Sequence, residues 1–240
     1  MGTRWKGKKY AAIAESNPMS QIVTQLQSSL ALSGAKAVLS GCSILFEATA
    51  EAADLLNRSC FGREINTSEK GKQWFQFGLE EAFYLHHKLQ AITIVSDKDR
   101  IVNEVELWEH MRSKAPRFTE LFKAYAHLRS KNWVVRSGTQ YGGDFVAYRH
   151  HPALVHSEYV VLVMSEVGDE NNARLRVWSD LQCSLRVSGS VAKTLLVLSI
   201  NKNGSDAGSP SCLEQFTVEE STMERWVPEQ CREEKCQDDN

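Results

Sequence analysis

Two stretches decide the fold: TQYGGDFVAYRHHPALVHSEYVVLV (residues 139–163) and SLRVSGSVAKTLLVLSI (residues 184–200). Both contain short runs of β-branched and aromatic residues bounded by turn residues, a pattern typical of strands. We expect strands at residues 145–148, 159–167 and 194–200, and the last two are apolar enough to lie inside a sheet. The second half of the chain is therefore predicted to contain a sheet.

A helix is predicted between the last two of these strands, at residues 174–187. Trp178, Leu181 and Leu185 fall on one face of this helix, as expected for a helix that covers a sheet. Shorter strands are expected on either side, at residues 133–135, 216–218 and 226–227.

The residues before 132 follow a helical pattern instead. Ile22, Leu26 and Leu30 recur every four residues and predict an amphipathic helix near residues 19–32. The stretch 72–129 also has the helical period. Pro116 begins the last helical run there, and the missing N–H of proline costs nothing in a first turn.

The chain is therefore predicted to be α/β (α+β), with a helical N-terminal domain followed by a mixed-sheet domain. We divide it into a partly helical extension at residues 1–69, a mainly helical domain at 70–130, a mixed-sheet domain at 131–228 and an acidic tail at 229–240.

The composition is that of an ordinary soluble protein of 240 residues, with 42% apolar residues and a net charge of −2. No apolar run approaches the roughly 18 residues of a membrane span, and the basic start of the chain lacks the apolar core of a secretory signal. The six cysteines form no C-x-x-C pair, which favours a reducing compartment and argues against zinc.

Positive charge is concentrated in two places. The first ten residues carry four basic residues and no acid, which indicates a solvated tail, or else a nuclear-import or RNA-contacting segment. Residues 112–149 carry eight basic residues and two acids. This second cluster predicts either a phosphate-binding face or a solvated helix face, and charge alone does not decide between them.

Candidate reactive residues stand at the ends of the predicted strands. Tyr148 ends one strand, His156 precedes the next, and Lys193 precedes the strand after the helix. Polar residues at the mouths of apolar strands can meet at one rim of a sheet, where their neighbours hold them rigidly. The chain has no Walker loop and no G-x-G-x-x-G, H-E-x-x-H or G-x-S-x-G motif, so the common signatures of other enzyme classes are missing.

The order of residues around these positions resembles the signature of the tRNA-intron endonuclease family. That signature reads W-V-x-x-x-G-x-x-Y-G-x-D-F-x-x-Y, then H-S/A-x-Y-x-V, a basic residue, and K-x-L-L. The matching residues are Trp133, Gly138, Tyr141, Gly142, Asp144, Phe145, Tyr148, His156, Tyr159, Arg186, Lys193, Leu195 and Leu196. The resemblance covers roughly residues 70–230, and it departs from the family in the turn at residues 149–152, where a glycine is common.

This resemblance implies a restriction-endonuclease-like catalytic domain and a catalytic subunit of the eukaryotic, 5′-splice-site type. Such a subunit acts on intron-containing pre-tRNA in the nucleus. The family resemblance further implies a heterotetramer with a second catalytic subunit and two structural subunits, and it implies neither a cofactor nor a metal.

The resemblance also implies a role for each reactive residue. The substrate's ribose 2′-OH attacks the adjacent phosphate and leaves a 2′,3′-cyclic phosphate and a 5′-OH end. Tyr148 is then the general base, His156 the general acid, and Lys193 stabilises the charged phosphorane. We expect the positive charge of Lys193 to lower the pKa of Tyr148, because a nearby cation favours the phenolate.

A second pair of residues is expected to contact RNA. In the family, an arginine and a tryptophan in the positions of Arg186 and Trp226 hold a base between them and serve the neighbouring catalytic subunit's site. Cation–π contact and stacking would supply the binding. The alternative is a surface arginine on a helix and a core tryptophan on the last strand.

Two other functions stay open. A metal-dependent nuclease would need Asp144 as a metal ligand, but no second carboxylate stands at suitable spacing, and we interpret Asp144 as a residue that fixes the loop. A non-catalytic RNA-binding or scaffold subunit of the same complex should lack one of the three reactive residues, whereas this chain has all three.

Overall fold

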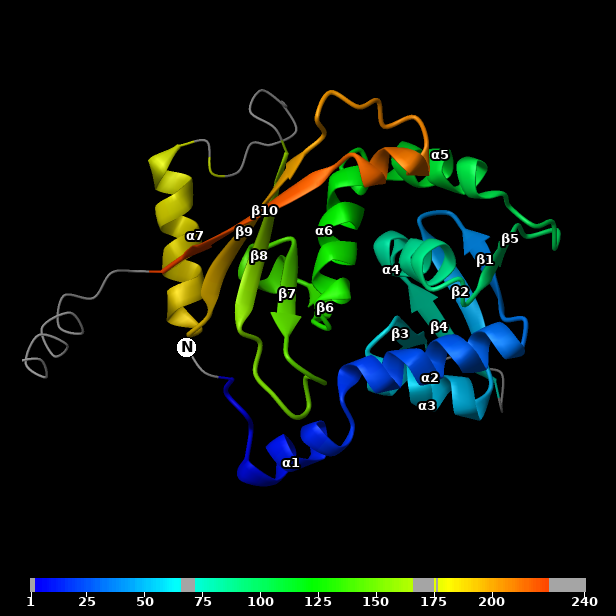
Figure 1. Ribbon diagram of the computed structural model, residues 1–240, viewed down its shortest axis with the longest axis horizontal. Helices are drawn as coiled ribbons and strands as arrows, with labels where there is room; N and C mark the ends of the chain where they lie inside the picture. Colours follow the sequence, from blue (N-terminus) through cyan, green and yellow to red (C-terminus); the bar gives the residue numbers. More distant parts are fainter. Residues whose placement is uncertain (1–2, 66–71, 166–174, 176, 225–240) are drawn as a thin grey trace, which may run out of the picture.

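Two five-stranded sheets, one in each half of the chain, form the described part of the protein (Figure 1). The structure is a computed structural model that describes residues 3–65, 72–165, 175 and 177–224. The elements of the first half are α1 (Lys8–Ser16), α2 (Met19–Leu32), β1 (Lys36–Ser40), β2 (Ser43–Ala48), α3 (Ala50–Ser59), β3 (Arg63–Ile65), β4 (Gln73–Phe77), α4 (Leu79–Phe83), a π-helical turn at Tyr84–Lys88, β5 (Thr93–Val95) and α5 (Glu104–Lys114).

The first sheet has the strand order β3-β4-β2-β1-β5. Its neighbouring strands are antiparallel except for β1 and β5, which run parallel. Helix α3 packs against β2 and β4 as well as against α2. The helix that the sequence predicts near residues 19–32 is confirmed, since α2 spans Met19–Leu32.

The strands of the first sheet correct the helical description of this half. Strands β1, β2 and β3 lie in the segment expected to be a partly helical extension, and β4 and β5 lie in the segment expected to be mainly helical. These strands have three to six residues each, which is too short for the alternation of apolar residues to stand out. Pro116 precedes the N-cap residue of α6 rather than occupying its first turn.

The second half carries the predicted mixed sheet, with the order β10-β9-β8-β7-β6. Strands β8 and β9 are parallel, and the other neighbours are antiparallel. Its elements are α6 (Phe118–Ser130), β6 (Val134–Ser137), a 3-10 turn η2 (Thr139–Tyr141), β7 (Phe145–Tyr148), β8 (Tyr159–Ser165), α7 (Trp178–Ser190), β9 (Thr194–Asn201), a 3-10 turn η3 (Pro210–Glu214) and β10 (Thr217–Met223).

Helix α7 supplies the crossover that two parallel strands require. The second sheet therefore lies between α6 on one face and α7 on the other, as Figure 1 shows. Leu181 and Leu185 of α7 pack on this sheet as predicted, whereas Trp178 is 69% exposed. The mixed α/β class is confirmed. The expected strand at residues 226–227 and the acidic tail lie outside the described residues.

Helix α6 joins the two halves, because it packs against α4 on one side and against β8 and β9 on the other. The Arg129 side chain on α6 is buried and donates to Ser59 O (3.2 Å) and Cys60 O (2.9 Å). Its guanidinium carbon lies 4.0 Å from the centroid of the Phe61 ring. One apolar core runs through both halves. No helix in the described part of the chain is long and apolar enough to cross a membrane.

Candidate active site at one end of the second sheet

The strand register brings two of the three predicted residues to the same end of the second sheet. Ala147 of β7 pairs with Tyr159 of β8, which pairs with Thr194 of β9. Tyr148 follows Ala147 and Lys193 precedes Thr194. Both therefore lie one residue beyond this row of paired residues, toward the same end of the sheet. Because side chains alternate between faces along a strand, both residues share the face that α7 covers.

Tyr148 is half-buried on this face, where it packs against the apolar cluster beneath α7. Burial raises the pKa of Tyr148 above its ordinary value, and a hydrogen bond with Ser157 acts in the opposite direction. The pKa of Tyr148 is thus raised, contrary to the expectation that it is lowered, and desolvation of the phenol is the dominant effect.

Lys193 instead lies over a different tyrosine ring. Its Nζ is 4.6 Å from the centroid of Tyr141, a residue of η2, and donates to Val191 O at 3.3 Å. Burial lowers the pKa of Lys193, and the positive charge of Arg4 lowers it further. A partly desolvated ammonium interacts more strongly with a phosphate oxygen than one in bulk water does, which suits this lysine to anion stabilisation.

His156 stands at the entrance to β8, between the strands that carry the other two residues. Its side chain is exposed, and its backbone N donates to Arg4 O at 3.1 Å. The neighbouring residue, Ser157, is buried. The imidazole is thus open to solvent while the backbone that carries it is fixed on both sides.

An ion pair and two aromatic rings hold the start of β8. Arg149 Nε lies 3.1 Å from a carboxylate oxygen of Glu158, and the guanidinium lies 3.9 Å from the centroid of Trp133. Trp133 in turn packs edge-on against Tyr159, with centroids 5.2 Å apart. These contacts explain why a tryptophan and a tyrosine belong to the signature, although neither reacts.

Asp144 fixes the loop between β6 and β7. Its Oδ2 accepts from Val163 N at 2.8 Å, and Oδ1 accepts from Arg117 at 3.2 Å. The interpretation of Asp144 as a loop-fixing residue is confirmed. Gly138 in the same loop faces Phe145 so closely that a Cβ would lie 2.6 Å from the Phe145 carbonyl oxygen, so the turn accepts only glycine there.

Only one residue of the second predicted pair, Arg186, lies in the described part of the chain. Arg186 is exposed on α7, as expected of a residue that contacts a ligand or another chain. Trp226 lies outside the described residues. Among the described residues, no three His, Cys, Asp or Glu side chains come together in a way that could hold a metal ion.

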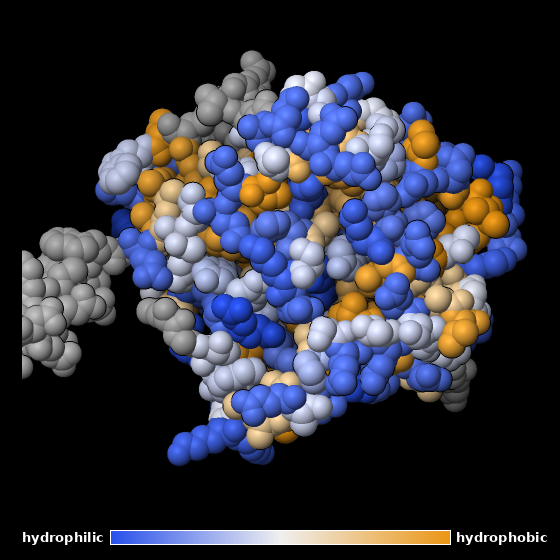
Figure 2. Space-filling model, in the orientation of Figure 1, coloured by the Kyte–Doolittle hydropathy of each residue, from blue (hydrophilic) through white to orange (hydrophobic). Residues whose placement is uncertain are grey.

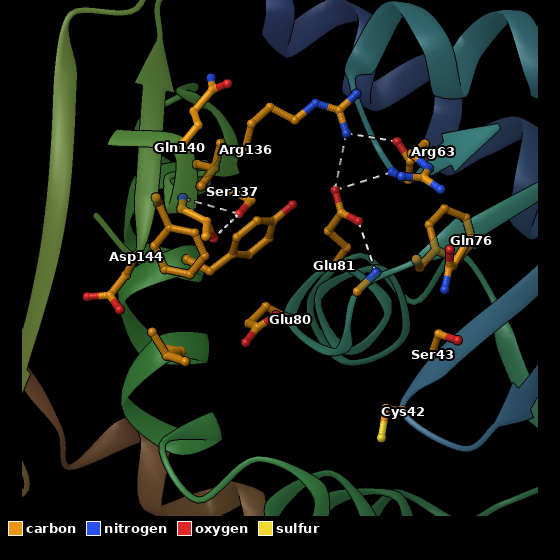
Figure 3. A pocket seen from close by; sticks show the side chains of 18 of the residues that line it. Cys42, Ser43, Arg63, Gln76, Glu80, Glu81, Arg136, Ser137, Gln140 and Asp144 are labelled. Atoms are coloured by element: carbon orange, nitrogen blue, oxygen red, sulfur yellow. Dashed lines mark hydrogen bonds and ion pairs between the residues drawn. The ribbon is translucent and has the colours of Figure 1, made fainter. Parts of the chain in front are cut away.

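A large cavity lies elsewhere. A cleft of about 1010 Å³ separates the two halves and is lined by charged residues of both signs, including Glu80, Glu81 and Arg136 (Figure 3). Glu81 accepts from Gly62 N (3.2 Å) and Gly78 N (3.1 Å) and lies 3.6 Å from Arg136. Figure 2 shows the hollow, bordered by hydrophilic residues. None of the three predicted catalytic residues lines this cleft.

Both halves of the chain match models of one enzyme family. Residues 35–108 match the N-terminal domain of tRNA intron endonuclease, and residues 118–206 match its catalytic C-terminal domain. The chain belongs to the tRNA intron endonuclease family, which confirms the resemblance found in the sequence. The first match begins at residue 35, so family likeness extends well before residue 70 and includes the strands of the first sheet.

Among the relatives, the tRNA-splicing endonuclease subunit Sen2-2 of Arabidopsis thaliana is 54% identical over 237 residues, or 98% of this chain and 93% of that protein. The tRNA-splicing endonuclease of Saccharolobus solfataricus is 30% identical over 172 residues, 70% of this chain and 91% of that protein. The Sen2 subunit of Mus musculus is 34% identical over 163 residues, 65% of this chain but 35% of that protein.

Proposed function

We propose that this chain is a catalytic subunit of a tRNA-splicing endonuclease and that it cuts intron-containing pre-tRNA at the 5′ splice site. One observation carries the proposal. Tyr148 at the end of β7 and Lys193 before β9 lie in one row on the same face of the sheet, with β8 between them and His156 at the entrance to β8. The 54% identity to a Sen2 subunit supports this assignment.

The proposed reaction uses a nucleophile that belongs to the substrate. The ribose 2′-OH oxygen forms a bond to phosphorus while the bond from phosphorus to the 5′ oxygen breaks. Tyr148 takes the proton of the 2′-OH, and His156 gives a proton to the departing 5′ oxygen. Lys193 stabilises the additional negative charge on the phosphorane, and the products are a 2′,3′-cyclic phosphate and a 5′-OH end.

The geometry of Lys193 fits its part in this reaction. The Tyr141 ring and the Val191 carbonyl hold the ammonium in place before substrate arrives. Preorganised donors of this kind are worth about 10²–10³ in rate. We expect Lys193→Met to lower kcat by that factor in single-turnover cleavage of pre-tRNA. Lys98→Met, which removes an exposed lysine in the loop after β5, is the matched control and should cut at the wild-type rate.

The test of the reaction itself uses the chain reconstituted with its partner subunits. Pre-tRNA with a 2′-deoxy nucleotide at the scissile position should not be cut, because the nucleophile is missing, whereas the same change one nucleotide upstream should have no effect. Cleavage of the 2′-deoxy substrate would rule the mechanism out. Cleavage should also persist in excess EDTA, since no reacting group in the proposed reaction is a metal ligand.

The alternative is a non-catalytic RNA-binding or scaffold subunit of the same complex. The retention of Tyr148, His156 and Lys193 favours the catalytic assignment. His156→Ala distinguishes the two, because a catalytic subunit loses one of two cuts while a scaffold subunit loses neither. His110→Ala is the control, since His110 bonds to Gly41 O in the other half of the chain.

We further propose that the working enzyme is a nuclear heterotetramer with a second catalytic subunit and two structural subunits. The exposure of Arg186 on α7 supports its proposed role, together with Trp226, in a neighbouring subunit's site. Purification of the tagged chain from nuclei, followed by identification of the bound chains, tests the composition. Arg186→Ala should then slow the cut made by the other catalytic subunit rather than the cut made by this chain.

A further inference from the structure

The basic N-terminal segment, residues 3–6, runs along the candidate site. Trp5 bridges to Val155 in antiparallel fashion, and Lys6 N donates to Leu154 O at 3.0 Å. The next bond in this short ladder is the one from His156 N to Arg4 O, 3.1 Å long. In Figure 1 the segment starts near the base of α7 and β9 and passes beside the connection between β7 and β8.

The side chain of Arg4 reaches a second part of the same site. Its guanidinium donates to Ala192 O, the carbonyl that immediately precedes Lys193. Arg4 and Ala192 also line one small cavity of about 230 Å³ together with Glu158 and Thr194, which flank the reactive positions. Arg4 therefore holds His156 through its backbone and the Lys193 turn through its side chain.

A further contact ties the turn between α1 and α2 to the connection between β7 and β8. His150 is buried, and its Nε2 donates to Asn17 O, in the turn between α1 and α2, at 2.8 Å. His150 belongs to the turn in which this sequence departs from the glycine common in the family.

We propose that Arg4 is a positioning residue of the active site, which fixes the acid His156 relative to the cation Lys193. The inference rests on the proposed function and adds a residue to it. An arginine suits this task because its fork is rigid and stays charged at all working pH values. Misplacing a reacting group by about 1 Å can cost on the order of 10²-fold in rate, so a brace between two elements of the site has a measurable effect.

The first experiment separates positioning from simple charge and from folding. We expect Arg4→Met to lower kcat in the reconstituted complex by between about 10-fold and 100-fold, with KM for pre-tRNA little changed. Arg4→Lys should recover part of the loss. Lys8→Met removes the same charge from the exposed start of α1 and should leave both constants unchanged. Equal losses in Arg4→Met and Lys8→Met would show an electrostatic effect on binding and would overturn the proposal.

The second experiment is a double-mutant cycle measured on residual single-turnover rates. If the Arg4 side chain acts by fixing the Lys193 turn relative to His156, Arg4→Met should cost less in the His156→Ala background than in the wild type, because one of the two groups that it aligns is gone. Fully additive losses would overturn the proposal. If His156→Ala cuts at the wild-type rate, the proposed function fails; if His156→Ala is slow but Arg4→Met is not, only this inference fails.

The third measurement does not depend on activity. Hydrogen exchange of the His156 amide should be slow in the wild type and in Arg4→Met, since the backbone bond to Arg4 O remains in both. Deletion of residues 1–6 should make this amide exchange fast. Fast exchange in the wild-type complex would show that the segment is not paired and would overturn the proposal.

Discussion

The pH dependence of cleavage is the sharpest test of the roles assigned to Tyr148 and His156. Burial holds the pKa of Tyr148 above its ordinary value near 10. At pH 7 the phenolate is then present in at most about one molecule in a thousand. The reactive form of the enzyme needs this rare phenolate together with a protonated histidine, and histidine is the side chain that exchanges a proton in the neutral pH range.

Between these two pKa values the two requirements cancel. Each pH unit raises the phenolate fraction tenfold and lowers the protonated histidine fraction tenfold, so the wild-type rate should be flat above the histidine pKa. Below it, the histidine is fully protonated and the rate should fall tenfold per unit as the phenolate disappears. A flat profile is thus expected although both groups take part.

The perturbation that exposes the phenolate is His156→Ala. Without the histidine, the rate follows the phenolate alone and should rise by about 30-fold between pH 7 and pH 8.5, whereas the wild-type rate should change by less than about twofold. The assay is single-turnover cleavage of end-labelled pre-tRNA by the reconstituted complex. Tyr148→Phe supplies the background from hydroxide-catalysed cleavage, and Lys98→Met should reproduce the wild-type profile.

Two results would refute this reasoning. A wild-type rate that rises tenfold per pH unit over this range would mean that no group protonated near neutral pH limits cleavage, so His156 is not the acid. A His156→Ala rate that stays flat would mean that the phenolate does not limit cleavage, so Tyr148 is not the base. Tyr141→Phe keeps the ring beneath Lys193 and should not change the shape of either profile.

The remaining predictions concern the framework. Arg129→Met leaves the carbonyls of Ser59 and Cys60 buried without their donor. Each stranded carbonyl should cost about 1–3 kcal/mol of unfolding free energy, measured by urea unfolding with Arg58→Met, at a partly exposed arginine, as the control. Asp144→Asn weakens the pair with Arg117 but keeps an oxygen for Val163 N, so cleavage should stay within about tenfold of wild type. Loss of cleavage in Asp144→Asn, with the fold intact by circular dichroism, would instead favour a metal-ligand role for Asp144.

The catalytic half could be predicted from the sequence because its strands carry strong local signals. Strand β7 lies at the expected residues 145–148, and β9 begins at the expected Thr194. The first sheet escaped prediction because its strands β3 and β5 have three residues each and are completed only by pairing with distant neighbours. Tertiary pairing, rather than local preference, forms such strands.

The basic stretch at residues 112–149 shows why a charge count does not locate a binding face. Arg117 pairs with Asp144, Arg129 satisfies buried carbonyls, and Arg136 donates to Gly62 O. These arginines hold the structure together, because buried acceptors need donors and arginine offers five of them. The stretch does contain eight basic residues, but these three arginines form neither a phosphate-binding face nor a solvated helix face.

The site residue that sequence reasoning missed is Arg4, whose contact with Ala192 joins positions 188 residues apart. No local pattern marks such a contact, and the basic start of the chain indicated only a tail, an import signal or an RNA contact.

On the proposed function, the separation between the cleft that divides the two halves and the reactive residues has a physical reason. A small substrate must be enclosed before catalytic groups can act on it, and its site is therefore concave. A pre-tRNA carries its own nucleophile and leaving group on its backbone, and this backbone can bind at one exposed end of the sheet. The reacting groups need only a rigid rim, which the ends of β7, β8 and β9 supply, and the proposed brace Arg4 ties two parts of that rim together.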